Sequence, residues 1–294
     1  MRHTRTLTAA ATVLAVAGLS ACNGPKNAPD ASGATKAVSV PMVTVADAMT
    51  QSTKATSQYT SAKIKMSEHV HVKGQDVSTT GSGAMSWKPI AMDMTMTMPQ
   101  LAAQLGGDGS MRVLMSGTTT YTNMGDAAAT NFGGKHWLKM DLSSLGASGQ
   151  AMANQMNSNS SNDPATQLKL FTSSADIKRA GQETVDGVQT THYSGTVDFA
   201  RLAAGQDPSL KSLLAQSTKL GLTTMNVDLW VNGQGLPVRV HESTPSTAAT
   251  QFDVTVDYSD YGTTPVTVTA PPASDTNDLA GMLNGASGSV GGTS

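Results

Sequence analysis

The feature that most constrains the fold is a regular alternation of apolar and polar residues. Between Ile64 and Val72, apolar residues occupy even positions and polar residues odd positions, with Glu68 as the one exception. The segment from Met92 to Met98 repeats the pattern, with methionine at every even position. A period of two places successive side chains on opposite faces of a strand. These segments therefore predict strands of a sheet that has one apolar face.

Further strand-like segments follow at short intervals. They are a Thr/Ser/Gly-rich segment up to Trp87, then 111–115 and 121–124. Strands joined by short connections pair with antiparallel neighbours, which predicts a meander. In the second half, 183–193 and 229–240 read as hairpins around Asp186-Gly187 and Asn232-Gly233, residues that tolerate a positive φ. A last alternating strand is predicted over 252–258.

Three segments carry helix-start signals. Thr44 is a candidate N-cap with Asp47 three positions on, and predicts a helix to about Ser57. Asp163-Pro164 and Asp207-Pro208 each place a proline at the first helical position. Apolar residues at helical spacing follow them, namely Leu168, Phe171 and Ala175 in the first segment and Leu210, Leu213 and Leu214 in the second. The Ser/Asn/Gln/Gly-rich stretch 142–162 is predicted to be a mobile loop. This element order predicts an α+β fold, a curved antiparallel sheet with helices packed on its concave side.

The N-terminus carries an export signal. Basic residues at positions 2 and 5 precede an apolar run from Leu7 to Leu19, which is too short to span a bilayer as a stable helix. The run ends in Leu19-Ser20-Ala21-Cys22, which resembles the lipobox of bacterial lipoproteins. Because Cys22 is the only cysteine, it cannot form an internal disulfide. We therefore expect residues 1–21 to be a signal peptide and Cys22 to carry a lipid such as palmitate at the outer face of the cell membrane. The alternatives are a secreted protein with a chance cysteine or an uncleaved anchor.

Composition sets the expected domain limits. Residues 22–42 hold hardly any large apolar side chain and are predicted to be a flexible tether, and 271–294 a disordered tail. Residues 43–270 then form one domain. The full sequence is only 14% charged, against about 25% in an average domain, and its net charge is −2. The sequence has no basic stripe interleaved with aromatic residues, so we expect no nucleic-acid partner.

A family resemblance adds to this interpretation. The residues that carry it are the lipobox at Cys22, Val185-Asp186-Gly187-Val188 with the following Thr191-His192-Tyr193, and Leu229-Trp-Val-Asn-Gly-Gln-Gly-Leu-Pro-Val-Arg239. Together with the element order, they resemble the LolA-like fold of the actinobacterial LppX, LprG and LprA lipoproteins, over roughly residues 43–270. The resemblance implies a half-barrel that holds lipid acyl chains. No binding residue is carried over, because the Met-rich and Ser/Asn-rich stretches have no counterpart that matches residue by residue.

The candidate ligand site is the apolar face of the sheet. Methionine is flexible and polarisable, which suits surfaces that adapt to varied ligands. Only 4% of the residues are aromatic, so few bulky rings are available to fill the interior. The predicted cavity lining is Met66, Met92, Met94, Met96, Met98, Met111, Val113, Met115, Leu168, Phe171, Leu210, Leu213 and Leu214. Alternatively, these methionines are ordinary core residues.

Other functions compete with lipid binding. An envelope sensor would use the same fold without a stable ligand. A copper-binding protein would combine thioethers with His69 and His71, although these histidines should lie on the face opposite Met66. Otherwise we expect no metal site and no cofactor. The sequence lacks a nucleophile elbow, a phosphate loop and a dinucleotide fingerprint, so an enzyme is not expected.

Overall fold

The computed structural model describes residues 44–281, except 73, 106, 159–162, 174–175, 205–220, 247 and 249. The chain divides into two units, 1–42 and 43–294, and every helix and strand that the structure describes belongs to the second unit. The predicted signal peptide, Cys22 and the tether lie outside the described residues, as do Leu210, Leu213 and Leu214.

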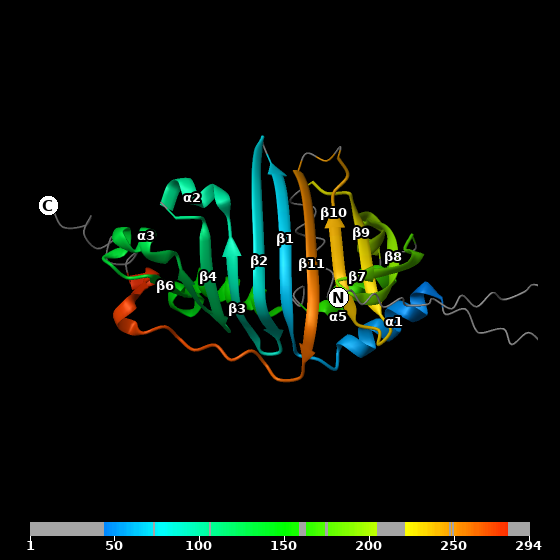
Figure 1. The fold of residues 1–294 in the computed structure, drawn as a ribbon, viewed down its shortest axis with the longest axis horizontal. Coiled ribbons are helices and arrows are strands. Elements are labelled where there is room, and N and C mark those ends of the chain that lie inside the picture. Colours follow the sequence, from blue (N-terminus) through cyan, green and yellow to red (C-terminus); the bar gives the residue numbers. More distant parts are fainter. Residues whose placement is uncertain are drawn as a thin grey trace, which may run out of the picture. The chain divides into compact units, whose positions relative to one another are not determined.

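A single twelve-stranded sheet forms the frame of this unit. The order of its strands is β12-β6-β5-β4-β3-β2-β1-β11-β10-β9-β8-β7. All pairings are antiparallel except that of β12 with β6, and the sheet is open and curved (Figure 1). The strands are β1 (Ser61–Val72), β2 (Gln75–Trp87), β3 (Ile90–Thr97), β4 (Ser110–Ser116), β5 (Thr119–Asn123), β6 (Trp137–Asp141), β7 (Lys178–Val185), β8 (Val188–Asp198), β9 (Thr224–Asn232), β10 (Pro237–Ser243), β11 (Thr250–Gly262) and β12 (Thr276–Asp278).

Short helices connect and cover the strands. They are α1 (Val45–Thr56), α2 (Pro99–Leu105), α3 (Gly125–Ala129), α4 (Gly146–Ser158), α5 (Pro164–Ser173) and α6 (Phe199–Ala204), with 3₁₀ turns η1 (Thr130–Phe132), η2 (Leu142–Leu145) and η5 (Ala273–Asp275). The predicted α+β class, with a curved antiparallel sheet and helices on its concave side, is confirmed.

The two faces of the sheet differ in chemistry. Residues at even positions of β1 and β11 lie on the concave face, which α1 and α5 cover and which we call the inner face. One core cluster joins Met49 of α1 and Phe171 of α5 to Ile64, Leu229 and Val240 of the sheet. The opposite, outer face carries mainly polar side chains. Burial of the apolar inner face, at about 25 cal/mol per Å², is the main force that holds the helices on the sheet.

Two of the predicted helix starts are confirmed. The hydroxyl of Thr44 accepts a hydrogen bond from the backbone N–H of Asp47 at 3.1 Å and caps α1. The buried carboxylate of Asp163 accepts from the N–H of Ala165 at 2.9 Å and forms an ion pair with Lys88 at 3.0 Å. Helix α5 therefore begins at Pro164, as the sequence predicts.

The hairpins are also confirmed, with one difference. Asp186 and Gly187 have φ values of 48° and 82° and form the two-residue turn between β7 and β8. The connection between β9 and β10 is longer than the predicted Asn-Gly turn. There the side chain of Asn232 accepts from the N–H groups of Gln234 and Leu236, and Gly235 adopts a φ of 80°.

The predicted mobile loop at 142–162 is wrong over most of its length, because 142–158 form η2 and α4. The sequence holds a cap signal at the start of this segment. Asp141 accepts a hydrogen bond from the N–H of Ser143 at 2.9 Å, and the hydroxyl of Ser144 donates to the carbonyl of Asp141. A capped start followed by Ala, Met and Gln favours a helix despite the neighbouring polar residues.

The predicted disordered tail begins too early. Residues 273–278 form η5 and β12, and β12 pairs with β6. Asp275 holds this segment in place, because its carboxylate accepts from the backbone N–H of His136 at 2.9 Å and contacts the ring Nδ1 at 2.7 Å. Residues 282–294 lie outside the described part of the chain.

Candidate functional site

The predicted methionines gather on one surface. Strand register pairs Met92, Met94 and Met96 of β3 with residues of β4, and an antiparallel pair projects its side chains to the same face. We call this surface the methionine face, and its members are Met66, Met92, Met94, Met96, Met111, Val113 and Met115.

Two glycines of β2 make room for these long side chains. A Cβ atom on Gly81 would lie 3.0 Å from Cγ of Met66 and 3.2 Å from Cε of Met94. A Cβ atom on Gly83 would lie 2.9 Å from Cγ of Met94 and would collide with the backbone of β3. The methionine side chains therefore lie across the bare backbone of β2, where any larger residue would displace them.

Burial differs among the residues of the methionine face. Met94 is 3% exposed and belongs to the core cluster, whereas Met66, Met92 and Met96 are half-buried and pack against it. Met111 and Met115 on β4 are half-buried and do not belong to that cluster. Next to Met111 lies a hollow of about 320 Å³ between the start of β4 and α3. The face thus combines a packed centre at Met94 and Val113 with accessible surface at Met111 and Met115 on β4.

The other predicted lining residues have different surroundings. Leu168 and Phe171 are 1% and 2% exposed and fill the core between α5 and the sheet. Met98 follows the end of β3, and its N–H donates to the carbonyl of Gly109 at 2.8 Å. Met98 is therefore outside the strand register that builds the methionine face.

Two carboxyl groups also lie on the inner face. Register places Glu242 of β10 and Glu68 of β1 on either side of Val254 of β11. Burial raises the pKa of Glu242 above its ordinary value, and burial followed by the nearby Glu242 raises that of Tyr258. The predicted cavity lining does not include these acids, although Glu68 is the residue that interrupts the alternation in 64–72.

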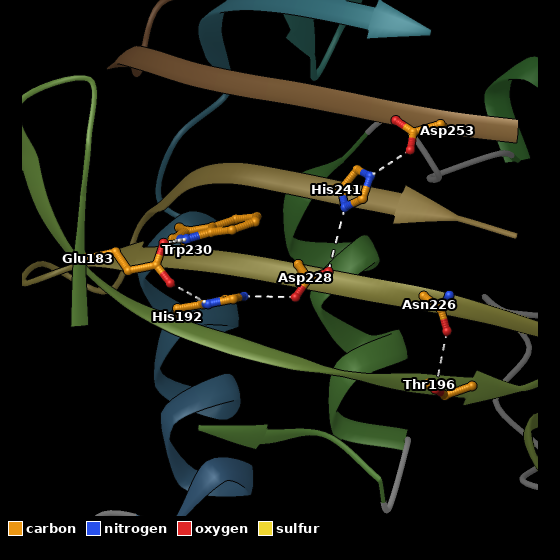
Figure 2. A network of polar contacts seen from close by, with 8 residues as sticks. All are labelled: Glu183, His192, Thr196, Asn226, Asp228, Trp230, His241 and Asp253. Atoms are coloured by element: carbon orange, nitrogen blue, oxygen red, sulfur yellow. Dashed lines mark hydrogen bonds and ion pairs between the residues drawn. The ribbon is translucent and has the colours of Figure 1, made fainter. Parts of the chain in front are cut away.

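A polar network crosses the outer face (Figure 2). His192 of β8 contacts Glu183 of β7 through Nδ1 and Asp228 of β9 through Nε2, each at 2.8 Å. His241 of β10 lies 3.5 Å from the second oxygen of Asp228 and 3.1 Å from Asp253 of β11. Acids and histidines thus alternate across five neighbouring strands, and each contact ties one strand to the next.

Trp230 completes this outer-face network. Its indole stacks on the His192 ring with centroids 4.3 Å apart and planes 9° apart, and its N–H donates to Glu183 at 3.0 Å. Hydrogen bonds from Trp230 and His192 lower the pKa of Glu183. Burial opposes ionisation of Asp228, but hydrogen bonds from Ser194, His192 and His241 still hold its pKa below the ordinary value. The sequence gives no sign of this network, because its members are brought together only by strand register.

The histidines proposed for copper lie away from the methionines. His69 and His71 occupy the outer face of β1, where their Nδ1 atoms contact Ser78 and Asp76 at 2.8 Å. A site that combines them with Met66 is therefore not assembled. Among the residues that the structure describes, no group of three or more His, Cys, Asp or Glu side chains is arranged to hold a metal ion. Likewise, none of the helices in the described part of the chain has the length and apolar character to cross a bilayer.

Comparison with known proteins identifies relatives of this chain. No family model matches it. A 31.2 kDa protein of Streptomyces griseus, from the region between rplA and rplJ, is 39% identical over 235 residues, which cover 75% of each chain. A Streptomyces coelicolor protein named as a lipoprotein is 30% identical, and the match covers 95% of this chain and 96% of that protein.

Among solved structures, the lipoprotein LppX of Mycobacterium tuberculosis matches with a TM-score of 0.46 and 18% identity, covering 76% of this chain and 98% of LppX. LppX is one of the proteins that the sequence resembles. Because 30% identity extends over nearly the full length of both proteins, this chain belongs to the family of actinobacterial lipoproteins that includes the Streptomyces coelicolor protein.

Proposed function

We propose that this protein is a lipid-anchored lipoprotein of the outer side of the cell membrane that holds a lipid or another amphiphile against its methionine face. Binding, not catalysis, is the proposed activity, in keeping with the lack of enzyme motifs in the sequence. A protein attached through Cys22 would present its domain at the membrane surface, where such ligands are found. The tether 22–42 would supply the reach between anchor and domain.

The single observation that carries the proposal is the change in packing along the methionine face. Met94 is closed into the core, whereas Met111 and Met115 on the next strand keep exposed surface. Half-buried methionine side chains on an otherwise apolar face offer a ligand flexible, polarisable contacts. Burial of an acyl chain there would contribute about 0.8 kcal/mol per methylene group.

Lipid analysis of the protein purified from a lipid-producing host tests the proposal. The full chain carrying Cys22→Ala would be expressed. Because this variant has no covalent lipid anchor, any lipid that it carries is a noncovalently bound ligand. Native mass spectrometry should then find a noncovalent lipid adduct that organic extraction removes. A protein that carries no lipid and takes up no acyl probe would favour the alternative, an envelope sensor or interaction module without a stable ligand.

A further inference from the structure

The C-terminal part of the domain crosses the sheet to reach its far edge. After β11, which lies in the middle of the sheet, residues 265–272 form neither helix nor strand, and the chain then forms η5 and β12 (Figure 1). Strand β12 pairs with β6 over three residues, in the parallel orientation. We call residues 263–278 the strap.

Apolar packing holds the strap only weakly. None of the residues 263–279, all within the described part of the chain, is buried, and even Val266 and Val268 are only half-buried. A segment that removes little apolar surface from water opens more easily than the core strands of a protein. The attachment of the strap therefore depends on its polar contacts.

The polar contacts of the strap converge on the segment that leads into β6. The carboxylate of Asp275 accepts a hydrogen bond from the backbone N–H of His136 at 2.9 Å and contacts Nδ1 of its ring at 2.7 Å. The side-chain amide of Asn277 donates to the carbonyl of Phe132 at 2.7 Å. Because histidine is the side chain whose ordinary pKa lies near neutral pH, the contact between Asp275 and His136 is open to control by pH.

Other charged groups lie around the His136 ring. Asp126 of α3 is 3.4 Å from Nε2, and because its side chain is fully exposed it adds only a weak attraction. Lys135 donates to a backbone carbonyl of β12 at 3.0 Å, and Lys139 of β6 lies 3.4 Å from Asp278 of β12. The two ring nitrogens of His136 therefore face two carboxylates, one on the strap and one on the helix that lines the hollow beside the methionine face.

The protonation state of His136 decides how its ring serves these contacts. A charged imidazole donates from both nitrogens, whereas a neutral one donates from a single nitrogen. The hydrogen bond to Asp275 raises the pKa of His136 above its ordinary value of 6.5, and hydrogen bonds from the backbone and ring of His136 lower the pKa of Asp275 below 3.8. The charged pair therefore contributes fully between pH 3.8 and 6.5, and its contribution is lost as pH rises through the raised pKa of His136.

We propose that His136 is a pH-dependent clasp for the strap: its charged ring holds Asp275 and keeps β12 on β6, and loss of that charge frees the strap to leave the edge of β6. At mildly acid pH the clasp is closed. At alkaline pH, β12 separates from β6 more often, and the backbone N–H and C=O groups along that edge lose their partners.

Hydrogen–deuterium exchange with mass spectrometry tests the clasp in the full chain carrying Cys22→Ala. Protection of the β12 amides is compared at pH 5.5 and pH 8.5, with labelling times corrected for the intrinsic pH dependence of exchange. The protection factor should fall about two- to fivefold at the higher pH, as expected when a partly exposed ion pair is lost.

Two variants identify the group that responds. His136→Gln keeps an N–H donor but never carries a charge, so its β12 protection should be low at both pH values. His71→Gln is the matched control, because Nδ1 of His71 contacts Asp76 at 2.8 Å and the two histidines are similarly exposed, at 41% and 35%. This control should show the same fall in β12 protection as the parent.

Three results would overturn the proposal. The first is equal protection of β12 at the two pH values in the parent, which is decisive even if a variant fails to fold. The second is a fall of the same size in His136→Gln, because another group would then control the strap. The third is a loss of protection throughout the sheet at pH 8.5, which would mean that the whole domain opens. A local fall that His136→Gln abolishes and His71→Gln retains supports the clasp.

Discussion

Nε2 of His192 lies 2.8 Å from Oδ1 of Asp228, on the neighbouring strand of the outer face. This contact is partly shielded from water, because the His192 side chain is 15% exposed and the Asp228 side chain 23%. It also connects the edge hairpin β7-β8 to the rest of the sheet. An edge hairpin has only one neighbouring strand, so side-chain contacts across that boundary help to fix it.

His192→Ala should therefore lower the free energy of unfolding by about 1–2 kcal/mol, since it removes two charge-assisted hydrogen bonds and the stack on Trp230. Urea denaturation measures the change. The matched control is His71→Ala, which removes a histidine contact to Asp76 at an exposed site and should cost less than about 0.5 kcal/mol. Equal losses in the two variants would show that the outer-face network adds nothing beyond a surface contact.

The two faces of the sheet should respond to pH with opposite signs. The pKa of Glu242 in the folded state is raised above its ordinary value of 4.5. At pH values between 4.5 and this raised pKa, the folded state therefore binds more protons than the unfolded state. The free energy of unfolding therefore falls as pH rises through that window. Glu242→Gln removes this loss, and its Tm should exceed that of the parent by a margin that grows as the pH rises above 4.5.

Glu183 provides the comparison for Glu242, because its pKa is lowered from 4.5. Its contribution to stability is present above pH 4.5 and is lost as pH falls through the folded-state pKa. Glu183→Gln should therefore lower the Tm slightly at neutral pH, by a margin that shrinks as the pH falls through the folded-state pKa of Glu183. Thermal scans of both variants across this range measure the differences. A lower Tm for Glu242→Gln at pH 8 would mean that the ionised carboxylate is stabilised.

Structural features that are set by residues close together in the chain could be predicted from the sequence. The Thr44 cap, the Asp186-Gly187 turn and the alternation on β1 and β3 are local signals, and all three are confirmed. The outer-face network could not be predicted, because His192 and Asp228 are 36 residues apart and meet only through strand register. The helix α4 is hard to predict for a different reason, since its Ser- and Asn-rich composition is typical of a loop and only the cap at Asp141 indicates a helix start.

The glycines below the methionine face should differ in their tolerance of substitution. A Cβ atom at Gly83 would collide with the carbonyl oxygen of Asp93, which cannot move without distorting β3. A Cβ atom at Gly81 would meet only side-chain atoms of Met66 and Met94, which can shift. Gly83→Ala should cost more than about 3 kcal/mol, and Gly81→Ala less than about 1 kcal/mol. Chemical denaturation of both variants measures this, and equal losses would contradict the proposed packing.

Cys22→Ala should release the protein from the membrane, because the lipid on this residue is the predicted anchor. Fractionation of cells and intact mass measurement check the result. We expect the parent in the membrane pellet and the variant in the soluble fraction without the mass of the acyl groups. Ser20→Thr keeps the cysteine and serves as a control that should remain anchored. Lipidation at Cys22 would be ruled out if the variant stayed in the pellet after a salt wash and if its mass differed from that of the parent only by the difference between the Cys and Ala side chains.

The difference in burial between Met94 and Met115 gives the final prediction. Met94 is 3% exposed within the core, so Met94→Asp would place a charge where no partner or water can reach it. This variant should lose more than about 3 kcal/mol of stability. Met115 lies on the same face but keeps accessible surface, so Met115→Asp can hydrate its carboxylate and remain folded.

Ligand binding is tested at Met115, because the Met115→Asp variant is expected to stay folded. If the accessible surface at Met111 and Met115 on β4 holds the acyl chain, Met115→Asp should weaken binding of a pyrene-labelled acyl probe by at least about tenfold while circular dichroism retains the sheet signal. Met115→Leu keeps an apolar side chain of similar volume and should bind as the parent does. A folded Met115→Asp protein with unchanged affinity would place the ligand away from β4. A Met94→Asp protein as stable as the parent would contradict the packed centre, since only a hydrated position tolerates an unpaired carboxylate.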